Sequence, residues 1–96
     1  MFSIIETEHF SEWLANLKDG ETKIRLARRL GKAKRGILGD VKPVGEGVCE
    51  MREFFGPGWR MYYVEQRGAI IFMLGGGDKS SQAKDIEKAI QLAKEL

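Results

Sequence analysis

The sequence from Gly47 to Ser80, GVCEMREFFGPGWRMYYVEQRGAIIFMLGGGDKS, decides the fold of this chain. It contains three short runs of apolar, aromatic and β-branched residues, at positions 48–55, 59–66 and 69–74. Three glycine-bearing segments close the runs: Gly56-Pro57-Gly58, Arg67-Gly68 and Gly75-Gly76-Gly77. Runs of this length between such turns are typical of an antiparallel meander of three β-strands.

The lengths of the turns predict which side chains share a face, because a slip of one residue moves every side chain of a strand to the other face. A two-residue loop at Arg67-Gly68 predicts the pairs Gln66–Ala69, Val64–Ile71, Tyr62–Met73 and Arg60–Gly75. A three-residue loop at 56–58 predicts the pairs Phe55–Trp59 and Arg52–Tyr62. One face is then an apolar core face with Cys49, Met51, Phe55, Trp59, Met61, Tyr63, Ile70, Phe72 and Leu74. The other face displays Glu50, Arg52, Phe54, Arg60 and Tyr62.

The flanking segments predict an opening strand and three helices. Residues 2–5 form a short apolar run, and Thr7 can cap a helix with an apolar stripe of Phe10, Trp13, Leu14 and Leu17. A second helix is predicted from about 21 to 35, with Ile24, Ala27, Leu30, Leu26 and Ala33 as its inward-facing residues. Residues 36–47 are rich in glycine and predict a loop. A last helix is predicted after Ser80 or Ser81, with a stripe of Ala83, Ile86, Ala89, Ile90 and Ala93.

The predicted order is therefore β-α-α-β-β-β-α, in a single domain over residues 1–96. An apolar sheet face covered by amphipathic helices is typical of a two-layer α+β fold, with a mainly antiparallel sheet and the helices packed on one face. This architecture leaves the face with Arg52, Arg60 and Tyr62 uncovered.

Composition limits where the protein works. The 96 residues contain one cysteine, Cys49, which cannot form an internal disulfide and has no partners for a metal site. A single thiol fits a reducing compartment. The amino terminus has no basic leader followed by a long apolar run, and no segment is long enough to cross a bilayer. We therefore expect a cytoplasmic protein with no membrane partner.

The formal net charge is only +2, but the positive charge is concentrated. Between Thr22 and Gly39 the sequence has no acidic residue and seven basic ones: Lys23, Arg25, Arg28, Arg29, Lys32, Lys34 and Arg35. A block of this kind attracts polyanions such as RNA, and it is also typical of a solvated helix face. Charge alone leaves both interpretations open.

No recognised catalytic or cofactor motif is present. The single histidine, His9, lies among polar residues of the first helix and is expected at the surface. The segment Gly75-Gly76-Gly77-Asp78-Lys79-Ser80-Ser81 resembles a phosphate loop, but it lacks the G-x-x-x-x-G-K-[ST] spacing. It is either a helix cap with a tight turn, or a site for one phosphate group.

The predicted strand pairing favours a phosphate site at one end of the sheet. It places the glycine turn beside Arg60, so that Lys79 can approach Arg60 and Arg52. Such a cluster can bind a phosphodiester and stabilise the charge of its transition state. Tyr62 and Phe54 can stack an unpaired base. The alternative is that the two arginines form cross-strand ion pairs with Glu50 or Glu53.

Several ordered motifs resemble the HigB/RelE-type toxins of bacterial toxin–antitoxin modules, in the group of addiction-module killer proteins. They are GVCEMR at 47–52, GPGWRMYY at 56–63, GGDKSSQ at 76–82 and GDVKPVG at 39–45. The resemblance extends to the early Trp13-Leu14 helix and the terminal Asp85-Ile86 helix, and so covers nearly the whole chain.

The resemblance implies a RelE/ParE-like fold and a ribosome-dependent endoribonuclease, an mRNA interferase that cuts mRNA in the ribosomal A site and inhibits translation. The cut uses the ribose 2′-hydroxyl as nucleophile, without a metal or other cofactor. Arg60 matches the arginine that contacts the scissile phosphate, and Lys79 falls where these toxins have a second catalytic arginine. With them we predict Arg52 and Tyr62 as catalytic residues. The basic second helix fits the surface that such toxins turn toward ribosomal RNA. The implied partner is a helix-turn-helix antitoxin encoded by a neighbouring gene.

The sequence departs from the family pattern at the groups that carry protons. RelE-type enzymes place lysines where this chain has Glu50 and Arg52, and they carry a tyrosine near the carboxyl terminus, whereas no tyrosine follows Tyr63 here. The carboxy-terminal histidine of other HigB proteins is also missing. Tyr62, Glu50 and Asp78 stay open as general acid or base. Two alternatives to the nuclease also stay open: a ParE-like toxin that binds a protein target such as DNA gyrase, and a non-catalytic homologue that binds the antitoxin.

Overall fold

A computed structural model describes all 96 residues, which form five strands and three α-helices. The elements in chain order are β1 (Ser3–Glu6), α1 (Glu8–Ala15), α2 (Gly20–Lys34), β2 (Val41–Gly45), β3 (Val48–Arg52), β4 (Arg60–Gln66), β5 (Ile70–Gly77), the 3₁₀ turn η1 (Lys79–Ser81) and α3 (Gln82–Lys94). The α+β class is as predicted. The strand count is not, because residues 41–45 form a strand where the sequence predicted a loop.

The five strands form one mixed sheet in the order β1-β5-β4-β3-β2. β1 runs parallel to β5, and the other neighbours are antiparallel. The unpredicted strand β2 lies at the edge, where a proline is tolerated because its outward side needs no hydrogen-bond donor. Pro43 and the register shift before Gly45 explain why its sequence does not resemble a regular strand.

The two helices that precede β2 form close to their predicted bounds. Thr7 is the N-cap of α1, and its hydroxyl oxygen accepts a hydrogen bond of 3.3 Å from the amide of Phe10. Asp19 caps α2 in the same way. The buried stripe of α2 consists of Thr22, Leu26, Leu30 and Ala33. Ile24 and Ala27 are exposed, so their prediction as inward-facing residues is wrong.

The register between β4 and β5 also corrects the prediction. Gln66 pairs with Ile70, which leaves a three-residue loop in which Arg67 and Gly68 both have left-handed backbone angles. The extra residue moves Ile70, Phe72 and Leu74 to the face opposite Met61 and Tyr63. The register of β3 with β4 differs from the prediction by two residues, and an even shift keeps every side chain on its predicted face.

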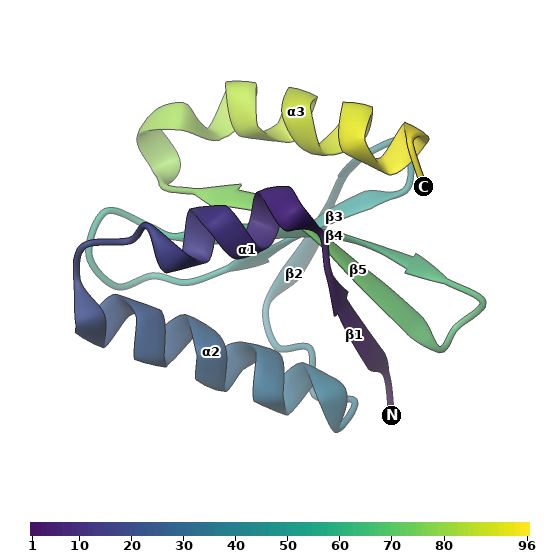
Figure 1. Cartoon of the computed structure of the whole chain (residues 1–96), viewed down its shortest axis with the longest axis horizontal. Coiled ribbons are helices and arrows are strands. Elements are labelled where there is room, and N and C mark those ends of the chain that lie inside the picture. Colours follow the sequence, from purple (N-terminus) through teal and green to yellow (C-terminus); the bar gives the residue numbers. More distant parts are fainter.

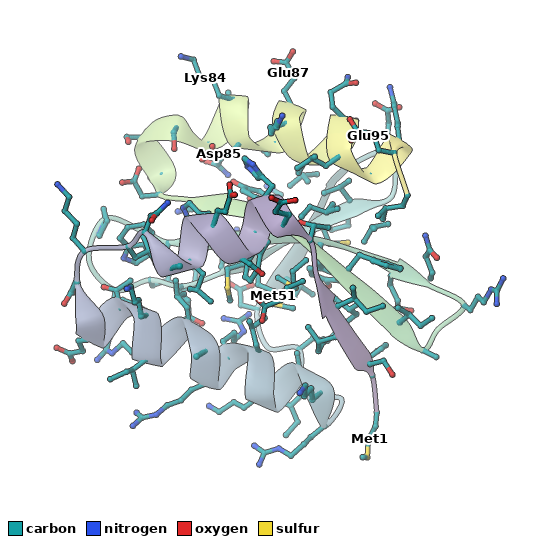
Figure 2. The ribbon with its side chains drawn as sticks, in the orientation of Figure 1. Met1, Met51, Lys84, Asp85, Glu87 and Glu95 are labelled. Atoms are coloured by element: carbon teal, nitrogen blue, oxygen red, sulfur yellow. The ribbon has the colours of Figure 1, made fainter.

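Helices cover both faces of the sheet, and not one face as predicted. On one side α1 and α2 pack on a buried cluster that contains Met51, Met61, Tyr63, Ile71 and Met73. On the other side α3 packs through Ala89 on Val48, Tyr62 and Leu74. Figure 1 shows α2 and α3 on opposite sides of the strands, with α1 between them. The outer side of α3 is solvated, and Figure 2 shows Lys84 and Glu87 there pointing away from the sheet.

The triple glycine ends β5 and does not form a turn. Gly75, Gly76 and Gly77 pair with Tyr62, Met61 and Arg60. A Cβ on Gly76 would collide with the Trp13 ring, and one on Gly77 would overlap the Asp85 carboxylate. The glycines therefore let α1 and α3 approach the strand closely, which is the packing role of glycine and not the phosphate-loop role.

Candidate functional site

Arg60 is a buried cation with few partners. It opens β4, and its relative exposure is 8%. Its Nη1 donates a hydrogen bond of 2.7 Å to the carbonyl oxygen of Gly58, whereas its Nε is buried without a partner. No carboxylate lies within 4.0 Å of its guanidinium, although other arginines of the chain form such pairs. Buried charges in proteins are usually paired, so an unpaired one marks a place where an anion can bind.

Lys79 comes to the same corner of the molecule. A Cβ built on Gly58 would lie 2.7 Å from Nη1 of Arg60 and 3.6 Å from Cβ of Lys79. The amide of Lys79 donates a hydrogen bond of 3.4 Å to the carbonyl oxygen of Pro57, which ties η1 to the β3–β4 connection. Lys79 is exposed. The stem of Lys79 therefore lies near Arg60, as predicted, although Arg60 pairs with Gly77 and not with Gly75; the predicted approach of Lys79 to Arg52 stays a prediction.

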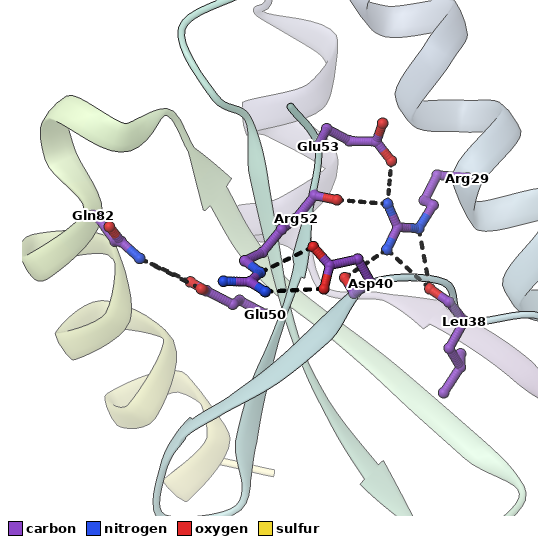
Figure 3. A network of polar contacts seen from close by, with 7 residues as sticks. All are labelled: Arg29, Leu38, Asp40, Glu50, Arg52, Glu53 and Gln82. Atoms are coloured by element: carbon purple, nitrogen blue, oxygen red, sulfur yellow. Dashed lines mark hydrogen bonds and ion pairs between the residues drawn. The ribbon is translucent and has the colours of Figure 1, made fainter. Parts of the chain in front are cut away.

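Arg52 lies directly opposite Arg60 in the β3–β4 ladder, but its guanidinium is engaged. Its Nε and Nη2 donate hydrogen bonds of 3.1 and 3.0 Å to the two carboxylate oxygens of Asp40, as Figure 3 shows. These hydrogen bonds raise the pKa of Arg52. The predicted alternative partners, Glu50 and Glu53, are wrong. Asp40 was not considered because its segment was interpreted as a loop.

Tyr62 and Glu50 form the buried floor beside Arg60. They face each other across β3 and β4, and their relative exposures are 0% and 1%. Burial raises the pKa of the Tyr62 phenol, whose oxygen has no hydrogen-bond partner. No part of the ring is free to stack a base, so that predicted role of Tyr62 is wrong. The cause is α3, which covers the face that the sequence left bare.

The first turns after β5 supply the polar cover of this floor. Nε2 of Gln82 donates to the Glu50 carboxylate at 3.1 and 3.5 Å, an interaction drawn in Figure 3. The hydroxyl of Ser81 donates to Asp85 at 2.6 Å. Asp78 accepts hydrogen bonds from the Ser80 side chain and amide, and these lower the pKa of Asp78. Gln82 and Asp85 were not predicted as site residues, because no strand pattern reports which face a distant helix covers.

One of the seven basic residues predicted to bind RNA, Arg29, instead connects α2 to other segments of the protein. Its guanidinium forms an ion pair with Glu53 and donates to the carbonyl oxygens of Leu38, Asp40 and Arg52 at 2.8 to 3.1 Å. Figure 3 shows this fan of contacts between α2 and the start of β2. All of its donors point into the protein, so Arg29 has none left for a nucleic acid.

Three of the remaining six residues share one groove. Arg25, Arg28 and Lys32 follow one side of α2 and, together with Arg29, Glu53 and Phe55, line a hollow of about 200 Å³. The guanidinium of Arg25 lies 4.4 Å from the centre of the Phe55 ring. Arg28 and Lys32 have no carboxylate within 4.0 Å, whereas Arg25 has Glu21 at 3.8 Å. Lys23, Lys34 and Arg35 lie outside this groove.

The rest of the surface adds limits. None of the five hollows in the structure is lined by Arg52, Arg60, Tyr62 or Lys79, so the Arg60–Lys79 corner is a shallow surface. No three side chains of the metal-binding types lie close enough together to hold a metal ion. None of the helices combines the length and the apolarity needed to cross a membrane.

Comparison with known proteins gives a relative but no activity. No family model matches the sequence. The chain is 41% identical over 87 residues to an uncharacterized protein of Haemophilus influenzae, and the match covers 91% of this chain and 88% of that protein. The chain belongs to the same family as that protein. Because the relative is itself uncharacterized, membership of the family assigns neither substrate nor partner.

Proposed function

We propose that this protein is the toxin of a type II toxin–antitoxin system, a RelE/HigB-type endoribonuclease that cleaves mRNA on the ribosome. One observation carries the proposal: a buried guanidinium, that of Arg60, has no carboxylate partner and lies beside the exposed Lys79. Two cations with free donors at one corner suit a phosphodiester, which carries a full negative charge and gains more in the transition state. The motifs that resemble this toxin family contain both residues.

The proposed reaction breaks the bond between phosphorus and the 5′-oxygen of the next nucleotide. The ribose 2′-oxygen attacks phosphorus, its proton passes to a base, the 5′-oxygen leaves and takes a proton, and a 2′,3′-cyclic phosphate remains. Arg60 and Lys79 bind the non-bridging oxygens, where charge develops. Removing one donor of this kind from an enzyme typically costs about 10²- to 10³-fold in rate. Arg52, held by Asp40, contributes positive potential without donating directly.

The pKa directions narrow the roles of the three proton carriers. Burial raises the pKa of Tyr62, so its phenol stays protonated at neutral pH and cannot serve as the base. The pKa of Asp78 is lowered by Ser80, which makes its carboxylate a weak base. Glu50 lies opposite Tyr62 in the β3–β4 ladder, and Gln82 donates a hydrogen bond to its carboxylate. Glu50 and the Tyr62 hydroxyl are both buried, so neither reaches an RNA strand at the surface, and we leave the acid and the base unassigned.

The groove on α2 is the proposed contact with ribosomal RNA. Arg28 and Lys32 are unpaired cations on the side of the sheet opposite the Arg60–Lys79 corner. A toxin that acts in the ribosomal A site contacts ribosomal RNA as well as mRNA, and phosphate contacts of this sort position a protein without reading sequence. We propose a helix-turn-helix antitoxin, encoded beside this gene, as the partner that holds the toxin inactive.

The shallow surface at Arg60 favours a second candidate, a toxin of the same fold that binds a protein target such as DNA gyrase. Enzyme sites are usually concave, and none of the five hollows lies at the cations. A protein partner needs only an exposed surface. This candidate predicts growth arrest that does not depend on Arg60.

The nuclease is tested by inducing the wild type and Arg60→Gln in bacteria and mapping transcript 5′ ends, with translation active or blocked. We expect new 5′ ends within open reading frames for the wild type, only when translation is active, and their reduction by about 100-fold or more for Arg60→Gln. Glutamine keeps a donor for Gly58 and removes the charge.

Matched controls come from the other end of β4 and from the outer side of α3. Arg67→Gln removes an exposed cation just beyond the end of β4 opposite Arg60, and Lys84→Ala removes an exposed cation that points away from the sheet; both should cleave as the wild type does. If Arg60→Gln arrests growth without new 5′ ends while DNA supercoiling falls, the protein-target candidate replaces the nuclease.

A further inference from the structure

The tip of the β3–β4 hairpin separates two adjacent phenylalanines. Backbone hydrogen bonds from Glu53 to Trp59 (2.9 Å) and from Gly58 to Phe55 (3.2 Å) close the tip. Gly56 and Gly58 have φ angles of 56° and 81°, which favour glycine. This backbone sends Phe55 toward the core, where Arg25 covers its ring, and leaves Phe54 in solvent.

Phe54 is exposed far beyond what its chemistry favours. Its relative exposure is 76%, and Met1, the first residue of the chain, is the one large hydrophobic residue that is more exposed. The guanidinium of Arg52 lies 5.7 Å from the centre of the ring. Arg52 is itself held by hydrogen bonds to both carboxylate oxygens of Asp40. An aromatic ring with a guanidinium on one side and its other face in solvent can act as a stacking platform for a base.

The residues around Phe54 indicate which ligand can bind the free face of its ring. Arg52 lies opposite Arg60 in the strand ladder, and Arg60 and Lys79 flank Gly58 in the same tip. The cation beside the Phe54 ring, Arg52, is thus the cross-strand neighbour of the unpaired Arg60. An unpaired nucleotide suits both features, because its planar base can stack on the ring and its phosphate can bind the cations.

We propose that Phe54 stacks one base of the RNA strand whose phosphate binds at Arg60 and Lys79. The inference rests on the proposed nuclease function and extends it to a base-binding position. Because every base has a π-face, the platform holds the strand without selecting its sequence. Phe54 takes the stacking role that the buried Tyr62 cannot perform.

The test is binding of two probes to the purified full-length protein, a short single-stranded RNA and the matching abasic ribose-phosphate strand. Phe54→Leu keeps an apolar side chain and removes the planar face, whereas Phe54→Trp keeps it. We expect Phe54→Leu to bind the RNA about 5- to 100-fold more weakly and to bind the abasic strand unchanged. Phe54→Trp should bind the RNA as tightly as the wild type or more tightly.

Ile37→Ala is the matched control, because Ile37 is another exposed hydrophobic residue, at 55%. It should bind both probes as the wild type does. Equal RNA affinity of Phe54→Leu and the wild type overturns the proposal, and so does an equal loss on both probes or a wild type that binds no RNA. If Phe54→Leu instead loses only its antitoxin, the ring belongs to a protein interface and the proposal is overturned.

Failure of the platform differs from failure of the nuclease. If Arg60→Gln and Lys79→Ala abolish cleavage of translated mRNA while Phe54→Leu changes neither binding nor cleavage, only the platform is wrong. If Arg60→Gln cleaves as the wild type does, the nuclease site itself is wrong.

Discussion

Arg29 and Arg60 are both nearly buried arginines, one on each side of the sheet, and they differ in what they bind. Arg29 uses its donors on Glu53 and on three backbone carbonyls. Arg60 donates once, to Gly58, and its Nε has no partner. A guanidinium whose donors are all satisfied ties segments together, whereas one with free donors keeps its charge for a ligand. The comparison separates a structural cation from a binding cation within one basic protein.

The largest expected effect is on the structural side. Arg29→Gln leaves Glu53 and three carbonyls without their donor, and breaking a buried pair in this way typically costs about 3–5 kcal/mol of unfolding free energy. The measurement is denaturant unfolding, with Arg60→Gln as the matched variant, for which we expect a change below about 1 kcal/mol. Comparable losses in the two variants would break the comparison, because Arg60 would then be structural too.

The comparison also explains which parts of the molecule were predictable. Strands β3 and β4 followed from the alternation of side chains, and the N-cap of α1 followed from Thr7; both are local signals. The faces of β5 could not be predicted from local signals. One extra residue in the loop after Gln66 reverses them, and the strand has an apolar face in either register. Both sides of β5 are apolar since helices cover both, a tertiary fact that a single strand does not report.

The site was predicted in the same uneven way. Lys79 and Arg60 converge because β5 ends beside the start of β4, which holds for the predicted register and for the observed one. Arg52 was predicted to bind phosphate, or alternatively to pair with Glu50 or Glu53, and it is bound by Asp40; Arg29 was predicted to bind RNA and forms an ion pair with Glu53. Asp40, which binds Arg52, and the carbonyl oxygens of Leu38 and Asp40, which bind Arg29, all lie just before β2, the edge strand that the sequence pattern did not predict.

The next largest expected effect is a pH dependence of stability that comes from neighbouring tyrosines, one on each face of the sheet. Tyr62 lies on the Arg60 side and Tyr63 on the Arg29 side, and burial raises the pKa of both, that of Tyr63 to about 12. The folded state therefore holds the Tyr63 proton more tightly than the unfolded state, where the pKa is 10.0. Its contribution is complete below pH 10 and is lost as the pH rises toward 12.

We expect a loss of roughly 2–3 kcal/mol of unfolding free energy from Tyr63 over this range, a pKa difference of about two units. Denaturant unfolding at pH 9, 10.5 and 11.5 measures it, with Tyr63→Phe as the variant that lacks the titrating group. The difference between the wild type and Tyr63→Phe should shift in favour of the variant as the pH rises. A difference that stays constant with pH would show that the phenol titrates normally.

The smallest expected effect concerns a third arginine, Arg52, whose guanidinium is bound less completely than that of Arg29 and more completely than that of Arg60. It has a bidentate partner like Arg29, but its side chain and that of Asp40 are 30% and 38% exposed. Exposed pairs contribute little, so Asp40→Asn should lower the unfolding free energy much less than Arg29→Gln does. It should also free the Arg52 guanidinium beside Arg60 and tighten binding of a single-stranded RNA. A loss near that of Arg29→Gln would place Arg52 with the structural cations, and weaker RNA binding would mean that Asp40 holds Arg52 where the strand needs it.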